Sequence, residues 1–196
     1  MKPGLMKDPG RSDHEISREP RVVLERMDAE ALFRAHAAFT ASLVHRLGVP
    51  ERDVRDLVQE VFLLAHRKGG YVPGPAKPRT WIAAIAVRLA AQYRRRRREE
   101  LDPVLAESAA TATPTPAEAA ELRESLERVN QCLSALDFDH RAVFLLYEVV
   151  GEHCKDIAVI LEVPIGTVYS RLHYARRSFA EEHARSGEDM TRRTGA

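Results

Sequence analysis

The chain has 196 residues, with 30 lysines and arginines against 29 aspartates and glutamates, and a formal net charge of +1. This length fits one ordinary domain or two small ones, and only 6% of the residues are aromatic, which favours helices over a β-sandwich. Apolar runs are too short for a transmembrane helix, the N-terminal stretch has no secretory signal, and two cysteines make no disulfide framework. We therefore expect an all-α protein of the cytoplasm that does not insert into a membrane.

The near-zero net charge conceals strong local differences. Residues 1–100 carry 20 basic and 13 acidic residues, residues 101–122 carry four acidic residues and no basic one, and residues 123–196 carry 10 basic and 12 acidic residues. The first of these segments ends in five consecutive arginines, Arg94 to Arg98. Such a run repels itself, and nucleic-acid phosphate would relieve the repulsion, although a solvated helix end is the alternative.

The N-terminal half of the chain predicts an extension followed by three helices. Residues 1–27 are rich in Pro, Gly and charge, which predicts a flexible extension. Within residues 28–100, apolar spacing predicts a helix over Leu32–Val44, a second helix capped by Asp53 and a third from about Arg79 into the arginines. A glycine- and proline-rich loop separates the last two. We expect the three helices to share one core and form the first domain.

The C-terminal half predicts a linker and a second helical domain. Residues 101–120 combine small residues with prolines, as flexible linkers do, and residues 184–196 have the composition of a flexible tail. Helical spacing returns within residues 121–183, over about 121–133, 139–150, 155–161 and 164–179. The predicted fold is therefore two small all-α domains joined by a flexible linker.

The last two predicted helices have the pattern of a helix-turn-helix. Apolar residues give each helix one buried face, and Pro164 stands where a helix start tolerates proline. In this motif the second helix lies in the major groove of DNA. The opposite face of that helix would present groups able to donate to base edges and phosphates, namely Tyr169, Ser170, His173, Arg176 and Arg177. An ordinary helical hairpin with a solvated face is the structural alternative.

Three stretches of the chain resemble extracytoplasmic-function (ECF) sigma factors of the sigma-70 family. The string VPIGTVYSRLHYAR at 163–176 resembles their region 4, and DLVQEVFL at 56–63 resembles a segment of region 2. RTWIAAIA at 79–86, followed by the arginines, resembles a second segment of region 2. The resemblance covers about residues 28–180 in the family's order and spacing.

The resemblance implies a transcription initiation factor that is not an enzyme and needs no cofactor or small-molecule substrate. Its partners would be core RNA polymerase, promoter DNA and an anti-sigma factor, which could hold it at the membrane while it otherwise works at the nucleoid in the cytoplasm. Region 2 would read and melt the −10 element of the promoter, and region 4 would read the −35 element.

The same resemblance assigns residues to these contacts. Contact with core polymerase falls on Asp56, Leu57, Gln59, Glu60 and Phe62. Contact with the −10 element falls on Lys77, Arg79, Trp81, Arg88, Gln92, Arg94, Arg95 and Arg96. Contact with the −35 element falls on Thr167, Tyr169, Ser170, Arg171, His173, Tyr174, Arg176 and Arg177. For Leu57, Phe62 and Trp81 we favour core packing as the alternative role.

Several positions depart from the family's pattern. Arg88 stands where Asn is frequent and Gln92 where Asp is frequent, so a common −10 sequence is not expected. Tyr169 and Tyr174 replace residues that are usually basic, which predicts an unusual −35 preference. Glu162 stands where the turn of the helix-turn-helix usually has Gly, and a left-handed backbone there would cost on the order of 1 kcal/mol.

Two other classes of protein compete with this interpretation. A helix-turn-helix repressor or activator that binds DNA without polymerase would explain residues 155–179 but neither the arginines nor the matches in the first half. An enzyme would need a catalytic motif, and the sequence has no HExxH, GxSxG, CxxC or phosphate-binding loop. No four-ligand metal site is evident, and a redox switch at Cys132 or Cys154 is a minor alternative.

Overall fold

The computed structural model describes residues 26–100 and 117–194, so the predicted extension and most of the predicted linker lie outside the described residues. Within these ranges the chain is helical apart from its connections and one isolated β-bridge. The elements are α1 (Ala29–Arg46), α2 (Glu51–Arg67), α3 (Pro78–Glu100), α4 (Ala117–Ser134), α5 (Phe138–Leu145), a π-helical turn η1 (Leu146–Val150), α6 (Cys154–Leu161) and α7 (Ile165–Thr194). The all-α prediction is confirmed.

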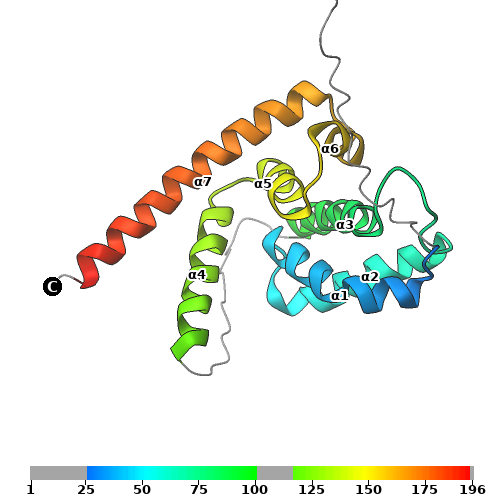
Figure 1. Cartoon of the computed structure of the whole chain (residues 1–196), viewed down its shortest axis with the longest axis horizontal. Coiled ribbons are helices and arrows are strands. Elements are labelled where there is room, and N and C mark those ends of the chain that lie inside the picture. Colours follow the sequence, from blue (N-terminus) through cyan, green and yellow to red (C-terminus); the bar gives the residue numbers. More distant parts are fainter. Residues whose placement is uncertain (1–25, 101–116, 195–196) are drawn as a thin grey trace, which may run out of the picture.

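The first domain consists of α1, α2 and α3, which pack against one another in pairs (Figure 1). Asp28 caps α1 by accepting a hydrogen bond from the Ala31 amide at 2.7 Å. The predicted cap of α2 is wrong, because Pro50 precedes the helix and Asp53 lies inside its first turn. The Asp53 carboxylate instead accepts a hydrogen bond from the Tyr93 hydroxyl at 2.5 Å, which ties the start of α2 to the far part of α3.

The loop between α2 and α3 is held against the chain just before α1. Met27 and Tyr71 exchange two backbone hydrogen bonds, of 3.1 and 2.8 Å, and the buried Tyr71 hydroxyl donates to the Ala76 carbonyl at 2.7 Å. Gly70 has a φ of +81° and lies so close to the Met27 carbonyl that a Cβ would collide with it. The glycine therefore permits the close approach that fixes the entry to α3.

The second domain contains α4 to α7, with the long α7 packed along α4, α5 and α6 (Figure 1). Asp137 caps α5 by accepting from the His140 amide at 3.0 Å. The helix predicted over 139–150 divides into α5 and η1, which ends at Gly151 with a φ of +84°. The helices predicted near 155–161 and from 164 are α6 and α7.

Both ends of the second domain differ from expectation. Helix α4 begins at Ala117, inside the segment predicted as linker, and α7 continues to Thr194 through the segment predicted as a tail. Residues 117–120 consist of Ala and Glu, and residues 184–196 contain Ala, Arg, Glu and Met; these residue types have high helix propensity, which the polar composition of the two segments had obscured. Stacking of Phe144 on Phe179, with ring centroids 4.9 Å apart, fixes α7 against α5 just before this extension.

The turn between α6 and α7 has the strained backbone that the sequence predicted. Glu162 has φ 56° and ψ 43°, and it is the only residue other than glycine with positive φ in the described ranges. A side chain there costs on the order of 1 kcal/mol relative to glycine. The local geometry of the helix-turn-helix therefore forms despite a substitution that opposes it.

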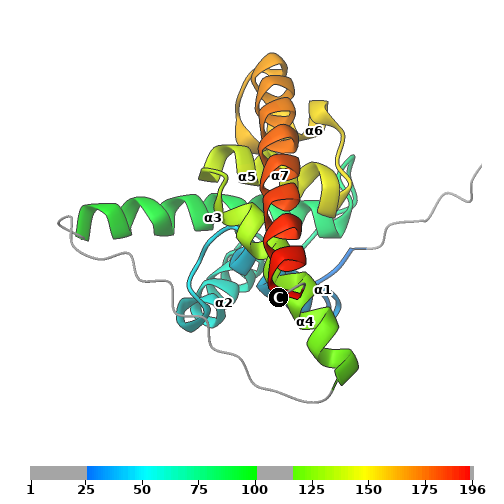
Figure 2. The same cartoon turned by 90° about the vertical axis from the view of Figure 1, so that its left-hand side faces the viewer.

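The two domains lie against each other through α3, which contacts η1 and α6. Arg79 of α3 donates to the Val149 carbonyl at 3.2 Å, and the buried Thr80 hydroxyl donates to the Glu152 carboxylate. Figure 2 shows that the C-terminal half of α3 projects beyond the other helices, while its N-terminal half lies beside the second domain. The domains are separate in sequence but share an interface in the structure.

Candidate nucleic-acid interface

Helix α7 presents one face to its own domain and another to solvent. Val168, Leu172 and Ala175 are buried beneath it, as the helix-turn-helix pattern predicted. The exposed side chains of the predicted −35 set on this helix are those of Tyr169, Ser170, His173, Tyr174, Arg176 and Arg177, while those of Thr167 and Arg171 are partly buried.

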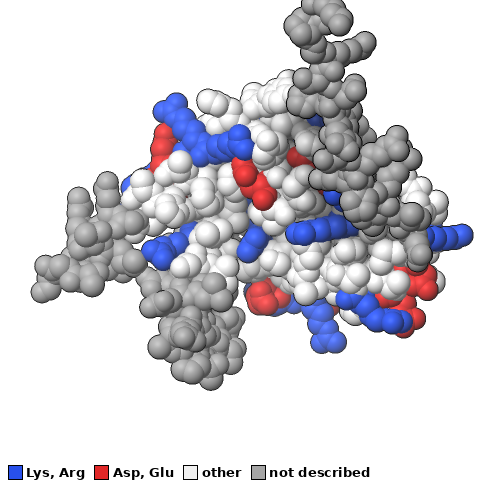
Figure 3. Space-filling view, viewed as in Figure 1, with Lys and Arg blue, Asp and Glu red and all other residues white. Residues whose placement is uncertain are grey.

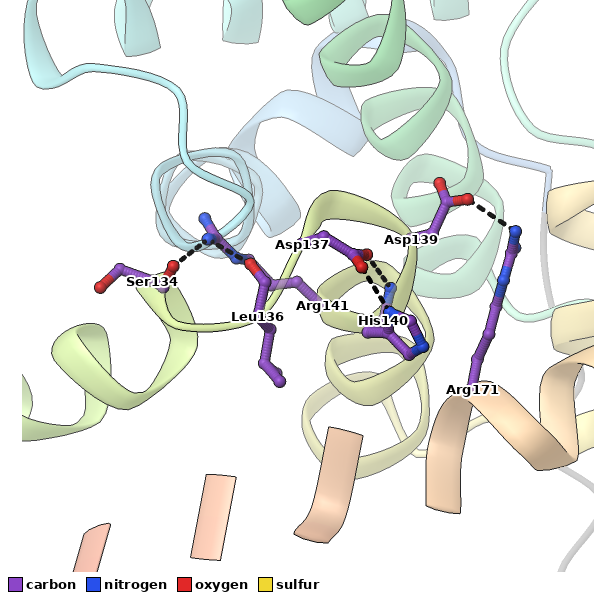
Figure 4. A network of polar contacts seen from close by, with 7 residues as sticks. All are labelled: Ser134, Leu136, Asp137, Asp139, His140, Arg141 and Arg171. Atoms are coloured by element: carbon purple, nitrogen blue, oxygen red, sulfur yellow. Dashed lines mark hydrogen bonds and ion pairs between the residues drawn. The ribbon is translucent and has the colours of Figure 1, made fainter. Parts of the chain in front are cut away.

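Two members of the predicted −35 set are held by the start of α5, and Figure 4 shows the contact of one of them, Arg171. Arg171 of α7 forms an ion pair with Asp139 at 2.6 Å, and its side chain is 24% exposed. The Tyr174 ring lies on the His140 ring, with centroids 4.4 Å apart, and His140 Nδ1 is 2.7 Å from the Asp137 carboxylate. These contacts fix the Arg171 and Tyr174 side chains against α5. In this structure the two side chains therefore orient α7 relative to α5.

The remaining arginines of the predicted −35 set differ in what they contact. Arg176 donates to Glu148 through Nε and Nη2 at 2.8 and 2.7 Å, and its guanidinium lies over the Tyr147 ring at 4.7 Å. The hydrogen bonds that Arg176 donates to the Glu148 carboxylate raise the pKa of Arg176. Arg177 is paired only with Glu181 of the same helix, at 2.8 Å, and is 74% exposed. Arg177 is therefore available to DNA, whereas Arg176 is held by η1.

The predicted −10 residues on α3 also divide into two groups. Arg79, Arg88 and Arg94 contact the second domain or the core: Arg79 lies over the Phe39 ring at 4.1 Å, and Arg94 lies over the Phe138 ring at 5.4 Å. Arg88 forms an ion pair with Glu162 at 2.9 Å. The others are exposed along α3 and the loop before it, namely Lys77, Gln92, Arg95 and Arg96.

Trp81 of the predicted −10 set is half-buried, which fits neither a fully buried core residue nor a free stacking surface. Its ring lies edge-on to the Tyr71 ring, with centroids 6.1 Å apart. Tyr71 is 2% exposed and is the largest fully buried side chain of the domain. Trp81 packs against the core from its half-buried position, whereas the loop before α3 folds Tyr71 fully inward.

The predicted polymerase-binding residues all lie on α2 but differ in how deeply they are buried. Leu57 and Phe62 are 4% and 6% exposed, which confirms core packing as their role in the folded chain, and the Phe62 ring meets the Phe33 ring at 5.0 Å. Asp56, Gln59 and Glu60 are exposed. Leu63, on the next turn of the same face, is a large apolar residue that is 47% exposed. The sequence analysis did not single it out, although the spacing 56, 59, 60, 63 places it on that face.

The structure also tests whether the titratable side chains could hold a metal or act as a redox pair. Among the described residues, no group of three or more His, Cys, Asp or Glu side chains could hold a metal ion. Cys132 and Cys154 are both buried free cysteines, and burial raises the pKa of the Cys132 thiol. A higher pKa lowers the fraction of reactive thiolate, so Cys132 is poorly suited to a redox role.

On the face shown in Figure 3, the charges of the described residues are spread over both domains. Figure 3 shows Lys and Arg side chains over both domains on the face in view, several of them beside acidic side chains. Within the described residues, Asp139, Glu148 and Glu162 neutralise arginines of the predicted DNA-binding sets. The sequence carried no signal for these pairings, because each joins residues at least 28 positions apart.

The fold and the exposed helix-turn-helix face define a two-domain DNA-binding protein of the transcription machinery. A family model described as "Sigma-70 region 2" matches residues 32–100, and one described as "Sigma-70, region 4" matches residues 126–179. The chain is 36% identical over 148 residues to the ECF RNA polymerase sigma-E factor of Escherichia coli K12, covering 70% of this chain and 77% of that protein. It belongs to the ECF sigma factors of the sigma-70 family.

Further comparisons agree with this membership. The RNA polymerase sigma-H factor of Pseudomonas aeruginosa is 32% identical over 146 residues, which are 69% of this chain and 76% of that protein. The crystal structure of the sigma factor RpoE of Bartonella quintana, solved in complex with the anti-sigma factor NepR, matches with a TM-score of 0.63 and 26% identity over 76% of this chain and 92% of that one. CnrH, solved in complex with the cytosolic domain of CnrY, shares the fold with a TM-score of 0.55.

Membership of this family decides between the functional classes that the sequence left open. A protein with sigma regions 2 and 4 directs RNA polymerase to promoters, so the independent repressor or activator is rejected. Neither matching family model is that of an enzyme. No helix in the described part of the chain is long and apolar enough to cross a membrane.

Proposed function

We propose that α7 reads the −35 element through its solvent-facing side chains, principally Tyr169, His173 and Arg177. All three are exposed and lie four residues apart along the helix, so they share one face. Hydroxyl, imidazole and guanidinium groups can donate to base edges and phosphates in the major groove. The observation that carries the proposal is this free face on a helix whose opposite side is fixed by Val168 and Leu172.

Arg171 and Arg176 take a supporting part in this proposal. Their guanidinium groups are held by Asp139 and Glu148, so they set the orientation of α7 relative to α5 and η1. Thr167 and Ser170 lie in the first turns, and Ser170 donates back to the Thr167 carbonyl at 3.0 Å. The N-terminal turns of a recognition helix are those that approach base edges, so these two side chains stand at its DNA-directed end.

For the −10 element we propose that the exposed cations of α3 hold the DNA backbone. Lys77, Arg95 and Arg96 are exposed, and the part of α3 that carries Arg95 and Arg96 projects from the molecule (Figure 2). Electrostatic contact with phosphate would position the strand, and Gln92 on the same segment could contact a base. Melting the element requires an unstacked base to be held, a role for which Trp81 is the aromatic candidate.

For polymerase we propose the exposed face of α2 formed by Asp56, Gln59, Glu60 and Leu63. Acidic and amide groups around a half-exposed leucine make a mixed surface of the kind found at protein interfaces. Leu57 and Phe62 lie beneath this face and hold α2 against α1 and α3. Because polymerase and the chromosome are its proposed partners, we place the protein in the cytoplasm at the nucleoid, where an anti-sigma factor could bind it and hold it at the membrane.

Transcription with reconstituted polymerase tests this function. Core RNA polymerase with the full chain should produce discrete transcripts from genomic DNA of the source organism, whereas core alone should not. The free chain should bind the same promoters as duplex DNA much more weakly than the holoenzyme does. Reconstituted holoenzyme that starts at no specific site, or free chain that binds duplex promoter as tightly as holoenzyme, would overturn the assignment.

The α2 surface is tested separately by affinity for core polymerase. Replacement of Asp56, Gln59 and Glu60 by Ala should weaken binding to core by about tenfold or more, because the surface loses three exposed polar contacts. Glu30→Gln on α1, which removes an exposed carboxylate outside this surface, is the control and should bind as the unchanged chain does. Equal affinity of the triple variant and the control would exclude α2 as the polymerase contact.

A further inference from the structure

The interface between the domains covers part of the surface assigned to the −10 element. Along α3, Arg79 donates to the Val149 carbonyl of η1, and Thr80 donates to Glu152 just beyond η1. Two turns further on, Arg88 pairs with Glu162 in the turn between α6 and α7. One side of α3 therefore contacts the second domain along its first three turns.

The predicted DNA-binding residues of both domains face a shared groove. Arg88, Gln92 and Arg95 of α3 line a groove of about 510 Å³, and Arg171 of α7 lines its other side. Glu162 lies on the wall opposite α3. Phosphate of a promoter strand would compete with Glu162 for the Arg88 guanidinium, because the two side chains already form an ion pair at this groove.

The Arg88–Glu162 pair joins two positions at which this sequence departs from the family. An arginine on α3 and a glutamate in a left-handed turn are each unexpected alone, and the second carries a backbone cost. In the structure their side chains meet at 2.9 Å. The pairing gives both departures one physical reason: together they form an ionic contact between the domains.

We propose that the Arg88–Glu162 pair is an intramolecular latch that holds the two domains together in the free chain and withholds Arg88 from promoter DNA. The part concerning DNA rests on the proposed assignment of Arg88 to the −10 element. The two side chains are 52% and 76% exposed, so water and salt weaken the pair. Such a latch favours the closed arrangement modestly and opens when polymerase or phosphate competes for either partner.

Distance measurements on the free chain test the latch without polymerase or DNA. Dyes at Ser42→Cys on α1 and Lys155→Cys on α6, both exposed positions, report the separation of the domains by fluorescence energy transfer. Both buried cysteines are replaced by Ala, and circular dichroism checks that the chain still folds. Glu162→Gln keeps the side-chain length and the backbone cost but removes the charge, and it should raise the ratio of open to closed molecules about two- to fivefold.

Three further variants make the result specific to the pair. Glu127→Gln removes an exposed carboxylate from α4, away from this interface, and should leave the energy transfer unchanged. Arg88→Glu should open the domains, and Arg88→Glu combined with Glu162→Arg should close them again. A Glu162→Gln variant that behaves as Glu127→Gln does, or a charge swap that fails to restore closure, would overturn the latch.

A DNA-binding measurement separates the latch from the −10 assignment. The free chain is titrated with single-stranded −10 DNA from a promoter found by the reconstituted transcription, and affinity is read by fluorescence anisotropy. Glu162→Gln should bind about two- to fivefold more tightly than Glu127→Gln. Opening of the domains without any gain in affinity would support the latch and overturn the assignment of Arg88 to the −10 element.

Discussion

The two helices proposed to contact DNA, α3 and α7, hold their arginines in different ways. On α7, Arg171 and Arg176 pair with acids of α5 and η1 in the same domain. On α3, Arg88 and Arg94 contact Glu162 and Phe138 of the other domain. Arg171 and Arg176 would therefore keep their partners if the domains separated, whereas Arg88 and Arg94 would lose theirs and become available.

The proposed DNA-binding face of α7 is therefore preorganised, whereas that of α3 is conditional, which means that its exposure depends on the position of the second domain. The face of α7 is set by contacts within one small domain, so its shape is the same in open and closed chains. The face of α3 depends on where the second domain lies. The predictions below test how independent the two domains are and how rigid each DNA-directed helix is, from the largest expected effect to the smallest.

The largest effect on stability should come from truncating one buried core side chain, first in one domain and then in the other. Ile82→Ala in the first domain and Ile157→Ala in the second each truncate a side chain with 0% exposure, and each should cost about 2–5 kcal/mol of unfolding free energy in its own domain. Trp81 is the only tryptophan, so its fluorescence in urea reports the first domain. Its midpoint should fall with Ile82→Ala and move less than half as far with Ile157→Ala.

This comparison has a clear opposite outcome. Buried apolar residues of both domains belong to one cluster, but fewer contacts join the domains than join the helices within each domain, so we expect weak coupling of their unfolding. Equal displacement of the Trp81 midpoint by both variants would show that the domains unfold as one unit. The face of α3 would then be as fixed as that of α7, and the distinction between a preorganised and a conditional surface would fail.

On α7 the exposed face should carry the sensitivity to promoter sequence. His173→Ala removes an exposed side chain of the proposed −35 face and should lower transcription from a −35-dependent promoter by about tenfold, within the 1–3 kcal/mol expected for one base contact. Arg185→Ala on the same helix is the control, because Arg185 pairs with Glu182 at 2.9 Å further along. Equal promoter activity of the two variants would place DNA recognition elsewhere on α7.

The contribution of Asp137, at the start of α5 beside α7, to the stability of the fold should depend on pH. Burial raises the pKa of Asp137, but hydrogen bonds from His140 outweigh it and lower that pKa overall. A carboxylate with a lowered pKa stabilises the fold above its ordinary value of about 4 and loses that contribution as pH falls through the folded value. Because the Asp137 side chain is 56% exposed, solvent screens this interaction, so Asp137→Asn should cost less than about 1 kcal/mol at pH 7 and almost nothing near pH 2.

Urea unfolding of the two chains at both pH values measures this difference. Asn can still cap α5 through its side-chain oxygen, so the variant isolates the loss of charge. A cost that is the same at both pH values would show that the cap, rather than the charge beside His140, supports the contact with Tyr174.

The smallest predicted effect is an increase in the unfolding free energy of the second domain. Glu162→Gly removes the backbone cost of a glutamate in the left-handed conformation and should raise the unfolding free energy of the second domain by up to about 1 kcal/mol. The measurement is made at high salt concentration, where the ion pair with Arg88 is screened. Glu162→Gln, which keeps the Cβ, should show no such gain. A loss of stability with glycine would mean that Glu162 makes a stabilising contact stronger than its strain.

Local sequence signals predicted most of the fold. Apolar residues such as Val168 and Leu172 recur at helical spacing, and spacing alone decides which face of a helix is buried. The left-handed turn at Glu162 was predictable because the loop between two close helices has few conformations. The cap of α2 was not predicted correctly, because Asp53 is used in a tertiary contact with Tyr93, and a local rule cannot show a partner 40 residues away.

The sequence by itself determined the family, the seven α-helices of the described part in outline and the solvent-facing side of α7 proposed to contact DNA, since each depends on residues a few positions apart. Only the tertiary structure decided which arginines are available. Arg177 is free of other elements, Arg171 is held by Asp139, and Arg88 is held by Glu162. An ion pair depends on where two distant segments meet in space, and the number and spacing of charges along a chain do not specify that.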